Sequence, residues 1–238
     1  MRLIACLPAM LALSAPQAMA GPGFFADFAV SSTLIDRGEQ LGRETLEASA
    51  GLEIPLGEAA AYGAVYRITP LGGDGPAFDE EVDYTLGLAW QGEGYSADVS
   101  ANWLTYPGSA AGESLELAGE VSLRSAFSPT LAGFYDADLD DWGLELTAGP
   151  QWQAGDWGLY AIGRLGFVDP AADGAPTRSY GGLEAGTSRA LTDRVEMGAY
   201  VRAEAADEPA FVDTISAGSV TGLTDTGLAA GIRLSLTG

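Results

Sequence analysis

Strict alternation of apolar and polar residues constrains this chain most, and it is clearest in the stretch DYTLGLAWQGEGYSADVSANWLTYPG at 83–108. Bulky apolar side chains occupy every second position of 84–90 and 95–103, and small or polar residues stand between them. Because successive side chains of a β-strand point to opposite faces, this period of two predicts a hairpin with one apolar and one polar face. The Gly-Glu-Gly sequence at 92–94 is the expected turn.

The same period of two recurs along the chain and predicts an all-β fold. We expect about twelve strands, with a range of roughly 10 to 14. No stretch after residue 20 is apolar for long enough to form a membrane-spanning helix. The alternating apolar residues, which share one expected face, fall at 28–30 and again at 34, then at 46–54, 62–68, 84–90, 95–103, 115–123, 131–135, 142–148 with 152, 157–167, 183–187, 195–201 and 228–236.

The connections between these strands alternate in length. The short ones fall at 55–58, 92–94, 127–129, 154–156 and 191–194. Between them lie mostly longer ones at 36–42, 70–80, 107–113, 169–176 and 205–224, and only the link at Asp140-Asp141 breaks the rule. Outer-membrane barrels alternate in this way, with short periplasmic turns and long extracellular loops, whereas a soluble sandwich has no reason to do so.

Aromatic residues recur at spacings that suit a lipid bilayer. Trp142 and Trp152 share one face ten residues apart, and so do Trp157 and Phe167. Ten residues of about 3.3 Å each, tilted near 40°, rise roughly 25 Å, which is the height of the apolar band of a membrane barrel. The predicted aromatic girdle comprises Tyr84, Trp90, Tyr95, Trp103, Trp142, Trp152, Trp157 and Phe167.

The beginning of the chain resembles an export signal. Met1-Arg2 precedes an apolar run and the sequence PQAMA, which is typical of a secretory signal cleaved after Ala20. We therefore expect a signal peptide at 1–20 and one transmembrane antiparallel up-and-down β-barrel at 21–238, with both termini periplasmic. The expected location is the bacterial outer membrane.

Composition excludes several classes of function. The chain contains no histidine and no lysine, and its one cysteine, Cys6, lies in the predicted signal. This excludes Ser-His-Asp hydrolysis, thiol chemistry and the usual zinc ligands, so we expect no enzyme, no cofactor and no metal site. The formal net charge of −22 makes nucleic acid an unsuitable partner. The long loops are acidic, but none has the spacing of a calcium-binding loop.

The period of two also assigns charged residues to the inner face. If the apolar side chains face lipid, most strand charges face the lumen, as the cost of a lipid-facing arginine requires. Acids outnumber arginines there, which predicts a mild preference for cations. The lumen could be a water-filled channel or could be plugged by Arg–Glu networks. The predicted pore-lining residues are Arg67, Arg124, Arg164, Arg178, Arg194, Arg202, Arg233, Asp83, Asp98, Glu116, Glu120, Glu145, Glu184, Glu196 and Glu204.

Two short motifs carry a resemblance to a known family. The sequence SSTLIDRGEQLG at 31–42 is similar to the opening strand and first loop of the TorF-type porins of Gram-negative bacteria. The sequence SANWLTYPGS at 100–109 resembles a recurrent Tyr-Pro-Gly strand end of that family. The resemblance marks Arg37-Gly38 and Tyr106-Pro107-Gly108 as family positions, and it implies passive diffusion across the outer membrane.

The expected function is therefore passive diffusion of small hydrophilic solutes or ions through a charged, mildly cation-selective lumen. The expected partners are outer-membrane lipid, lipopolysaccharide and those solutes, and the oligomeric state is left open. One alternative is a non-conducting outer-membrane barrel whose acidic loops bind a partner or stabilise the envelope. Another is a secreted soluble β-barrel that binds an apolar ligand inside.

Overall fold

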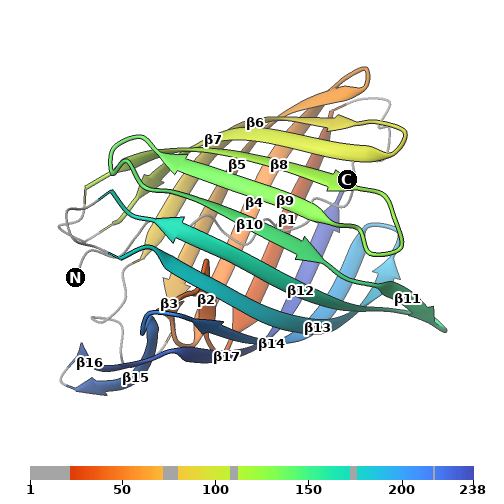
Figure 1. The fold of residues 1–238 in the computed structure, drawn as a ribbon. Coiled ribbons are helices and arrows are strands. Elements are labelled where there is room, and N and C mark those ends of the chain that lie inside the picture. Colours follow the sequence, from red (N-terminus) through yellow and green to blue (C-terminus); the bar gives the residue numbers. More distant parts are fainter. Residues whose placement is uncertain (1–21, 72–79, 108–111, 172–175, 217) are drawn as a thin grey trace.

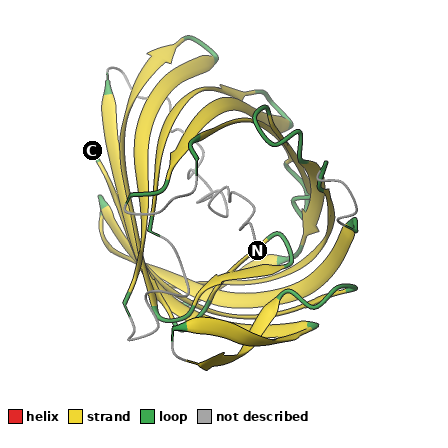
Figure 2. Ribbon diagram, turned by 90° about the vertical axis from the view of Figure 1, so that its left-hand side faces the viewer, coloured by secondary structure: helices red, strands yellow, loops and turns green. Residues whose placement is uncertain are grey.

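Twelve long antiparallel strands close into a barrel in the computed structural model, which describes residues 22–71, 80–107, 112–171, 176–216 and 218–238 (Figures 1 and 2). Each strand pairs with its neighbours in chain order, and β1 pairs with β17 to close the ring. The predicted up-and-down barrel is confirmed. Its strands are β1 (Gly23–Ser31), β4 (Thr45–Leu56), β5 (Ala59–Pro70), β6 (Glu81–Gln91), β7 (Tyr95–Thr105), β8 (Ser114–Leu123), β9 (Thr130–Asp136), β10 (Trp142–Ala148), β12 (Trp157–Asp169), β13 (Arg178–Thr192), β14 (Val195–Ala206) and β17 (Thr226–Thr237).

Five shorter strands complete the described structure. Strand β11 (Gln151–Ala154) continues the line of β10 and pairs with β12. The connection between β1 and β4 forms a small hairpin, β2 (Leu34–Asp36) and β3 (Glu39–Gly42). The connection between β14 and β17 forms another, β15 (Phe211–Ser216) and β16 (Ser219–Thr224). No helix in the described part of the chain is long and apolar enough to cross a membrane.

The outer face of the barrel is apolar because the alternation in sequence matches the register between strands. Leu86 pairs with Ala101 and is 73% exposed, whereas Asp83, three residues earlier and on the other face, is 2% exposed. Leu228 of β17 is 75% exposed in the same way. Apolar side chains that are exposed over a whole closed surface fit a surrounding of hydrocarbon, where every backbone polar group must be paired within the barrel.

All eight residues of the predicted girdle lie on this outer face. Trp90, Tyr95, Trp152 and Trp157 lie toward the end that carries the short turns, and Tyr84, Trp103, Trp142 and Phe167 lie toward the other end. Across neighbouring strands, Tyr84 pairs with Trp103. The rings of Trp142 and Phe167 meet edge to face with centroids 5.0 Å apart.

Strand β5 overturns one expectation, because its faces are the reverse of the predicted ones. Tyr66 pairs with Asp83 and is only 4% exposed, so the alternating apolar residues of 62–68 point inward. Arg67 consequently lies on the outer face between Ala48 and Val82, and its guanidinium contacts the Glu80 carboxylate at 3.0 Å. The prediction that Arg67 faces the lumen is therefore wrong.

Hydrogen bonds to inward carboxylates explain why these tyrosines point inward. The Tyr62 hydroxyl donates to the Asp98 carboxylate at 2.9 Å, and the Tyr66 hydroxyl donates to the Glu47 carboxylate at 2.7 Å. The Tyr62 ring also covers Gly87 of β6, where an added Cβ would lie 2.3 Å from the ring. A tyrosine has an apolar body and a polar tip, so the pattern of apolar residues alone does not decide its face.

Candidate functional site in the barrel lumen

The first connection, which was expected as a long external loop at 36–42, instead folds into the lumen as the β2–β3 hairpin. Its two-residue turn is Arg37-Gly38, with φ angles of 46° and 76°. Positive φ at both central residues defines the type I′ turn, which suits a tight hairpin and favours glycine at the second position. A Cβ on Gly38 would also lie 2.6 Å from the Cβ of Tyr180 on β13. The inward hairpin corrects the expected position of this segment.

Apolar contacts hold the base of the hairpin against the inner wall. Leu34 packs against Tyr66 and Ile68 of β5, and all three are buried. On the other side, Ile35 packs against Phe211 of β15 and Ala229 of β17, which are buried as well. Burial of each large apolar side chain contributes roughly 1.5–3 kcal/mol, so these two clusters supply a substantial part of the docking energy.

The tip of the hairpin reaches across the lumen to strands β8 and β9. The Arg37 guanidinium donates two hydrogen bonds to the Glu116 carboxylate, at 2.8 Å and 3.3 Å. Its central carbon lies 3.4 Å from the centroid of the Phe134 ring. Glu116 is completely buried, so this bidentate pair is withdrawn from solvent and ties the hairpin to the opposite wall.

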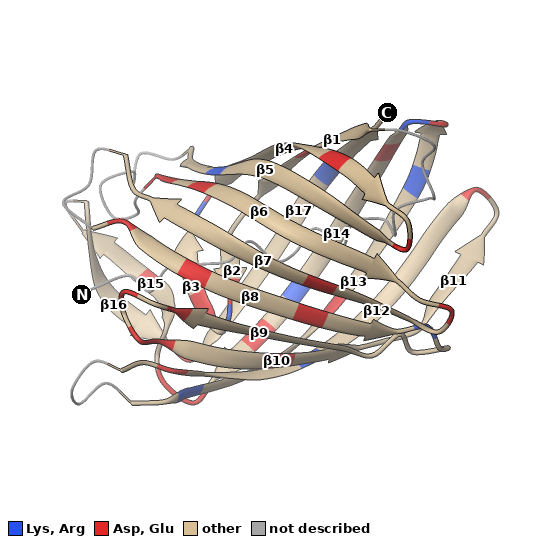
Figure 3. Ribbon diagram, turned by 90° about the horizontal axis from the view of Figure 1, so that it is seen from above, with Lys and Arg blue, Asp and Glu red and all other residues tan. Residues whose placement is uncertain are grey.

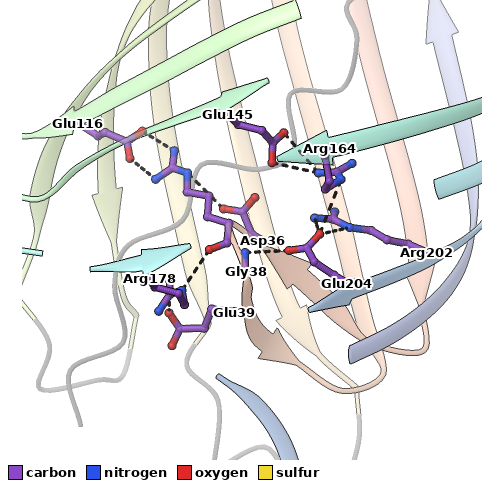
Figure 4. Close-up of polar contacts among 10 residues, drawn as sticks. Asp36, Gly38, Glu39, Glu116, Glu145, Arg164, Arg178, Arg202 and Glu204 are labelled. Atoms are coloured by element: carbon purple, nitrogen blue, oxygen red, sulfur yellow. Dashed lines mark hydrogen bonds and ion pairs between the residues drawn. The ribbon is translucent and has the colours of Figure 1, made fainter. Parts of the chain in front are cut away.

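A second anchor joins the hairpin to Glu204 of strand β14, which also contacts Arg164 of β12 (Figure 4). The Gly38 amide donates to the Glu204 carboxylate at 2.8 Å, and Glu204 also accepts from the Arg202 guanidinium at 2.9 Å. Arg164 lies at the centre of this network, with guanidinium nitrogens 3.4 Å from Glu145, 3.5 Å from Glu184 and 3.7 Å from Glu204.

Arg178 provides a third anchor. Its guanidinium donates to the Arg37 carbonyl oxygen at 3.3 Å and lies 3.0 Å from the Glu39 carboxylate (Figure 4). The hairpin is therefore held from strands β8, β13 and β14 as well as by its apolar base. These strands lie on different sides of the ring, so the hairpin narrows the lumen.

Burial shifts the pKa values of the carboxylic acids in the hairpin. The hairpin lies inside the barrel and is not part of its wall. Burial raises the pKa of Asp36 to about 7, although the charges of Arg37 and Arg202 act in the opposite direction. Burial also raises the pKa of Glu39, and Arg178 opposes that shift.

The lumen wall is divided by charge. The inward arginines of the wall strands lie on β12, β13, β14 and β17, where several inward acids accompany them. The described strands from β4 to β9 present acids to the lumen and no inward arginine, as their registers show. Figure 3 marks acidic positions in red along β7 and β8. The inward acids of β4 to β9 are Glu47, Glu53, Glu81, Asp83, Asp98, Glu116, Glu120 and Asp136.

The structure places most of the predicted lumen residues on the inner face. These are Arg164, Arg178, Arg202, Arg233, Asp83, Asp98, Glu116, Glu120, Glu145, Glu184, Glu196 and Glu204. Arg124 and Arg194 lie in turns at the short-turn rim, where the Arg124 side chain contacts Gln91. Contact of any of these side chains with a solute stays a prediction.

Sequence reasoning missed the residues that the hairpin brings into the lumen, Asp36, Arg37 and Glu39, and also Phe134 beneath Arg37. The adjacent apolar pair Leu34-Ile35, just before the expected loop at 36–42, is the signal that could have found them, because two neighbouring apolar residues break the alternation of a strand with one polar face. Among the described residues, no group of three or more Asp, Glu, Cys or His side chains is arranged to hold a metal ion.

Comparisons with known proteins agree with this fold. No protein-family model matches the chain, and no curated protein sequence matches it. An outer membrane channel from Pseudomonas putida F1 superposes with a TM-score of 0.54 at 7% identity, over 92% of this chain and 95% of that one. The NanC porin gives a TM-score of 0.51 at 8% identity, over 89% of this chain and 98% of that one.

Identities this low show likeness of fold alone. The fold is that of outer-membrane β-barrels, and a closed twelve-stranded barrel with an apolar outer face fits the predicted location in the bacterial outer membrane.

Proposed function

We propose that this protein is an outer-membrane channel for passive diffusion of small hydrophilic solutes or ions, and that the β2–β3 hairpin forms its constriction. The observation that carries the proposal is a closed barrel whose lumen is lined by carboxyl, guanidinium and hydroxyl side chains and narrowed by an anchored hairpin. The resemblance to TorF-type porins and the likeness in fold to a porin and an outer membrane channel agree with it. Nothing in the proposed mechanism is enzymatic.

The acids of β4 to β9 support a mild preference for cations. Two of them, Glu47 and Asp98, receive hydrogen bonds from tyrosine hydroxyls, which orient them without neutralising their charge. Because no arginine of these described strands faces the lumen, this side of the lumen attracts cations, whereas the other side balances arginine against glutamate. From the hairpin side, the Arg37 guanidinium meets Glu116 of this wall.

The apolar outer face favours this function over a soluble ligand-binding barrel. We propose that it contacts outer-membrane lipid, and that the two groups of aromatic residues lie at the two lipid interfaces. The acidic external loops would then lie beside lipopolysaccharide. A non-conducting barrel would share these features, so conduction is the property to measure.

Swelling of proteoliposomes in small sugars tests the proposal directly. The expected result is swelling that slows with increasing sugar size, and a failure to swell in any sugar would favour the non-conducting alternative. In planar bilayers with a KCl gradient, the expected reversal potential indicates cation preference.

Glu120→Gln tests the charge argument, because it removes an acid from the wall that has no inward arginine among its described residues. The variant is expected to weaken cation preference. Glu93→Gln is the control, since Glu93 lies exposed in a turn outside the lumen. Anion preference in the parent protein would contradict the charge assignment.

A further inference from the structure

Arg37 occupies a site that is built like a receptor for a planar organic cation. The carboxylate of Glu116 meets two guanidinium nitrogens, and the Phe134 ring covers one face of the guanidinium at 3.4 Å. Both residues belong to the barrel wall, on β8 and β9, whereas Arg37 belongs to the hairpin. We refer to Glu116 and Phe134 together as the guanidinium site.

The surroundings of the guanidinium site contain more buried carboxyl groups than one arginine can contact. Asp136 pairs with Glu116 in the register and is 2% exposed, and its Oδ2 has no hydrogen-bond partner among the described residues. Asp83, two strands away, is equally buried, and neither of its carboxylate oxygens has a hydrogen-bond partner there. The other oxygen of Asp136, Oδ1, accepts from the amides of Asp138 and Leu139. Buried carboxyl oxygens without a hydrogen-bond partner are costly, so this wall favours a bound cation that can donate to them.

We propose that the guanidinium site is a receptor for solutes that carry a guanidinium group, and that Arg37 is its built-in ligand. A solute of this class would compete with Arg37, release the tip of the hairpin and widen the lumen. The proposal rests on the proposed function, since it names the class of solute that opens the constriction of the channel.

The geometry selects a guanidinium over an ammonium ion. A guanidinium is planar and presents parallel N–H groups, so it can bond both oxygens of a carboxylate while it stacks on an aromatic ring. An ammonium ion is a compact charge and satisfies only one of these contacts well. Competition is also feasible, because Arg37 holds a left-handed φ of 46° that a free solute does not have to adopt.

Chemical rescue tests the site without any measurement of transport. The full chain carrying Arg37→Ala, folded in detergent, is titrated with guanidinium chloride at concentrations on the order of millimolar, the range of a short-tether effective concentration. The expected result is a saturable rise in the midpoint of thermal unfolding. Urea, which is planar and neutral, is the matched control and is expected to give no rise.

The double variant Arg37→Ala with Glu116→Gln identifies the contact that is responsible. It is expected to lose the response to guanidinium. If Arg37→Ala does not fold, Arg37→Lys replaces it, because lysine keeps the positive charge but lacks the parallel N–H groups of a guanidinium. The absence of a saturable guanidinium effect, or an equal effect of urea, would overturn the proposal.

Transport measurements with the parent protein complete the test. L-arginine and L-citrulline have nearly the same shape, but citrulline carries a neutral ureido group. Swelling is expected to be severalfold faster in L-arginine than in L-citrulline, and the difference is expected to vanish in Glu116→Gln. Equal rates would contradict the proposal. Rescue in detergent without any swelling would instead refute the channel function and leave the guanidinium site in place.

Discussion

Replacement of Gly38 by alanine should release the hairpin from the lumen. The residue has a φ of 76°, and a left-handed conformation costs a residue with a Cβ roughly 1–2 kcal/mol. The new Cβ would lie 2.6 Å from the Cβ of Tyr180, so the turn has to move. That movement breaks the 2.8 Å hydrogen bond from the Gly38 amide to Glu204, and a buried polar group left without a partner costs about 1–3 kcal/mol.

Together these terms weaken docking by roughly 2–5 kcal/mol, which corresponds to a rise of about 30-fold or more in the undocked population. The assay uses Leu34→Cys, a substitution at a buried hairpin position, in a Cys6→Ser background, and follows labelling by a water-soluble thiol reagent. Labelling of this introduced thiol should accelerate by the same factor when Gly38→Ala is added.

Gly57→Ala is the matched control for backbone strain. Gly57 has a φ of 81° in the β4–β5 turn, and a Cβ there would meet nothing within 4 Å. This substitution should leave the labelling of the introduced thiol unchanged. Equal labelling with and without Gly38→Ala would refute the inference that the turn is held in the lumen by these contacts.

Three further predictions concern the inner face. Tyr62→Phe should lower barrel stability by about 1 kcal/mol through loss of the bond to Asp98, as measured by the heat needed to shift its mobility in SDS gels, whereas Tyr84→Phe on the outer face should not. Arg164→Leu should cost about 3–5 kcal/mol because it leaves three acids of the network without their shared cation, whereas Arg67→Leu at the outer rim should cost little; equal losses would contradict the assigned faces. Docking of the hairpin should weaken as pH rises from about 4 to about 7. The pKa of Asp36 is raised in the docked hairpin, so over this interval the docked form holds a proton that the released form gives up. Labelling of the Leu34→Cys variant, normalised to a variant with an exposed thiol, should accelerate over that interval and level off above it.

The barrel itself could be predicted from the sequence because the alternation of side chains that produces it is a local pattern. A period of two sorts side chains onto two faces, and the register then brings like faces together around the ring. The predicted outward positions of β6, β7 and β12 are outward in the structure for this reason, among them Leu86, Val99 and Leu165. The alternation of turn lengths follows from the same closed topology.

The hairpin could not be predicted in this way because its contacts are distant in sequence. Arg37 and Glu116 are 79 residues apart, and Gly38 and Glu204 are 166 apart. The strand pattern predicts that the side chains of Glu116 and Glu204 point into the lumen. It does not predict which other segment of the chain enters the lumen and contacts them. The glycine of the Arg-Gly pair favours the left-handed conformation that a tight turn requires at its second position. This local signal predicts a hairpin, but it does not predict where the hairpin lies in the barrel.

The reversed strand β5 and the inward hairpin have one physical explanation. Leu34 needs an apolar surface inside the lumen, and the inward Tyr66 and Ile68 of β5 supply it. Had β5 shown those residues to lipid, as its apolar pattern predicts, Leu34 would face Arg67 instead, and the base of the hairpin would lose its apolar support. The inward tyrosines of β5 are stable in the lumen because Glu47 and Asp98 accept hydrogen bonds from their hydroxyl groups. A sequence rule that tests each loop and its flanking residues for adjacent apolar side chains, before it assigns the faces of the neighbouring strands, would have found both features together.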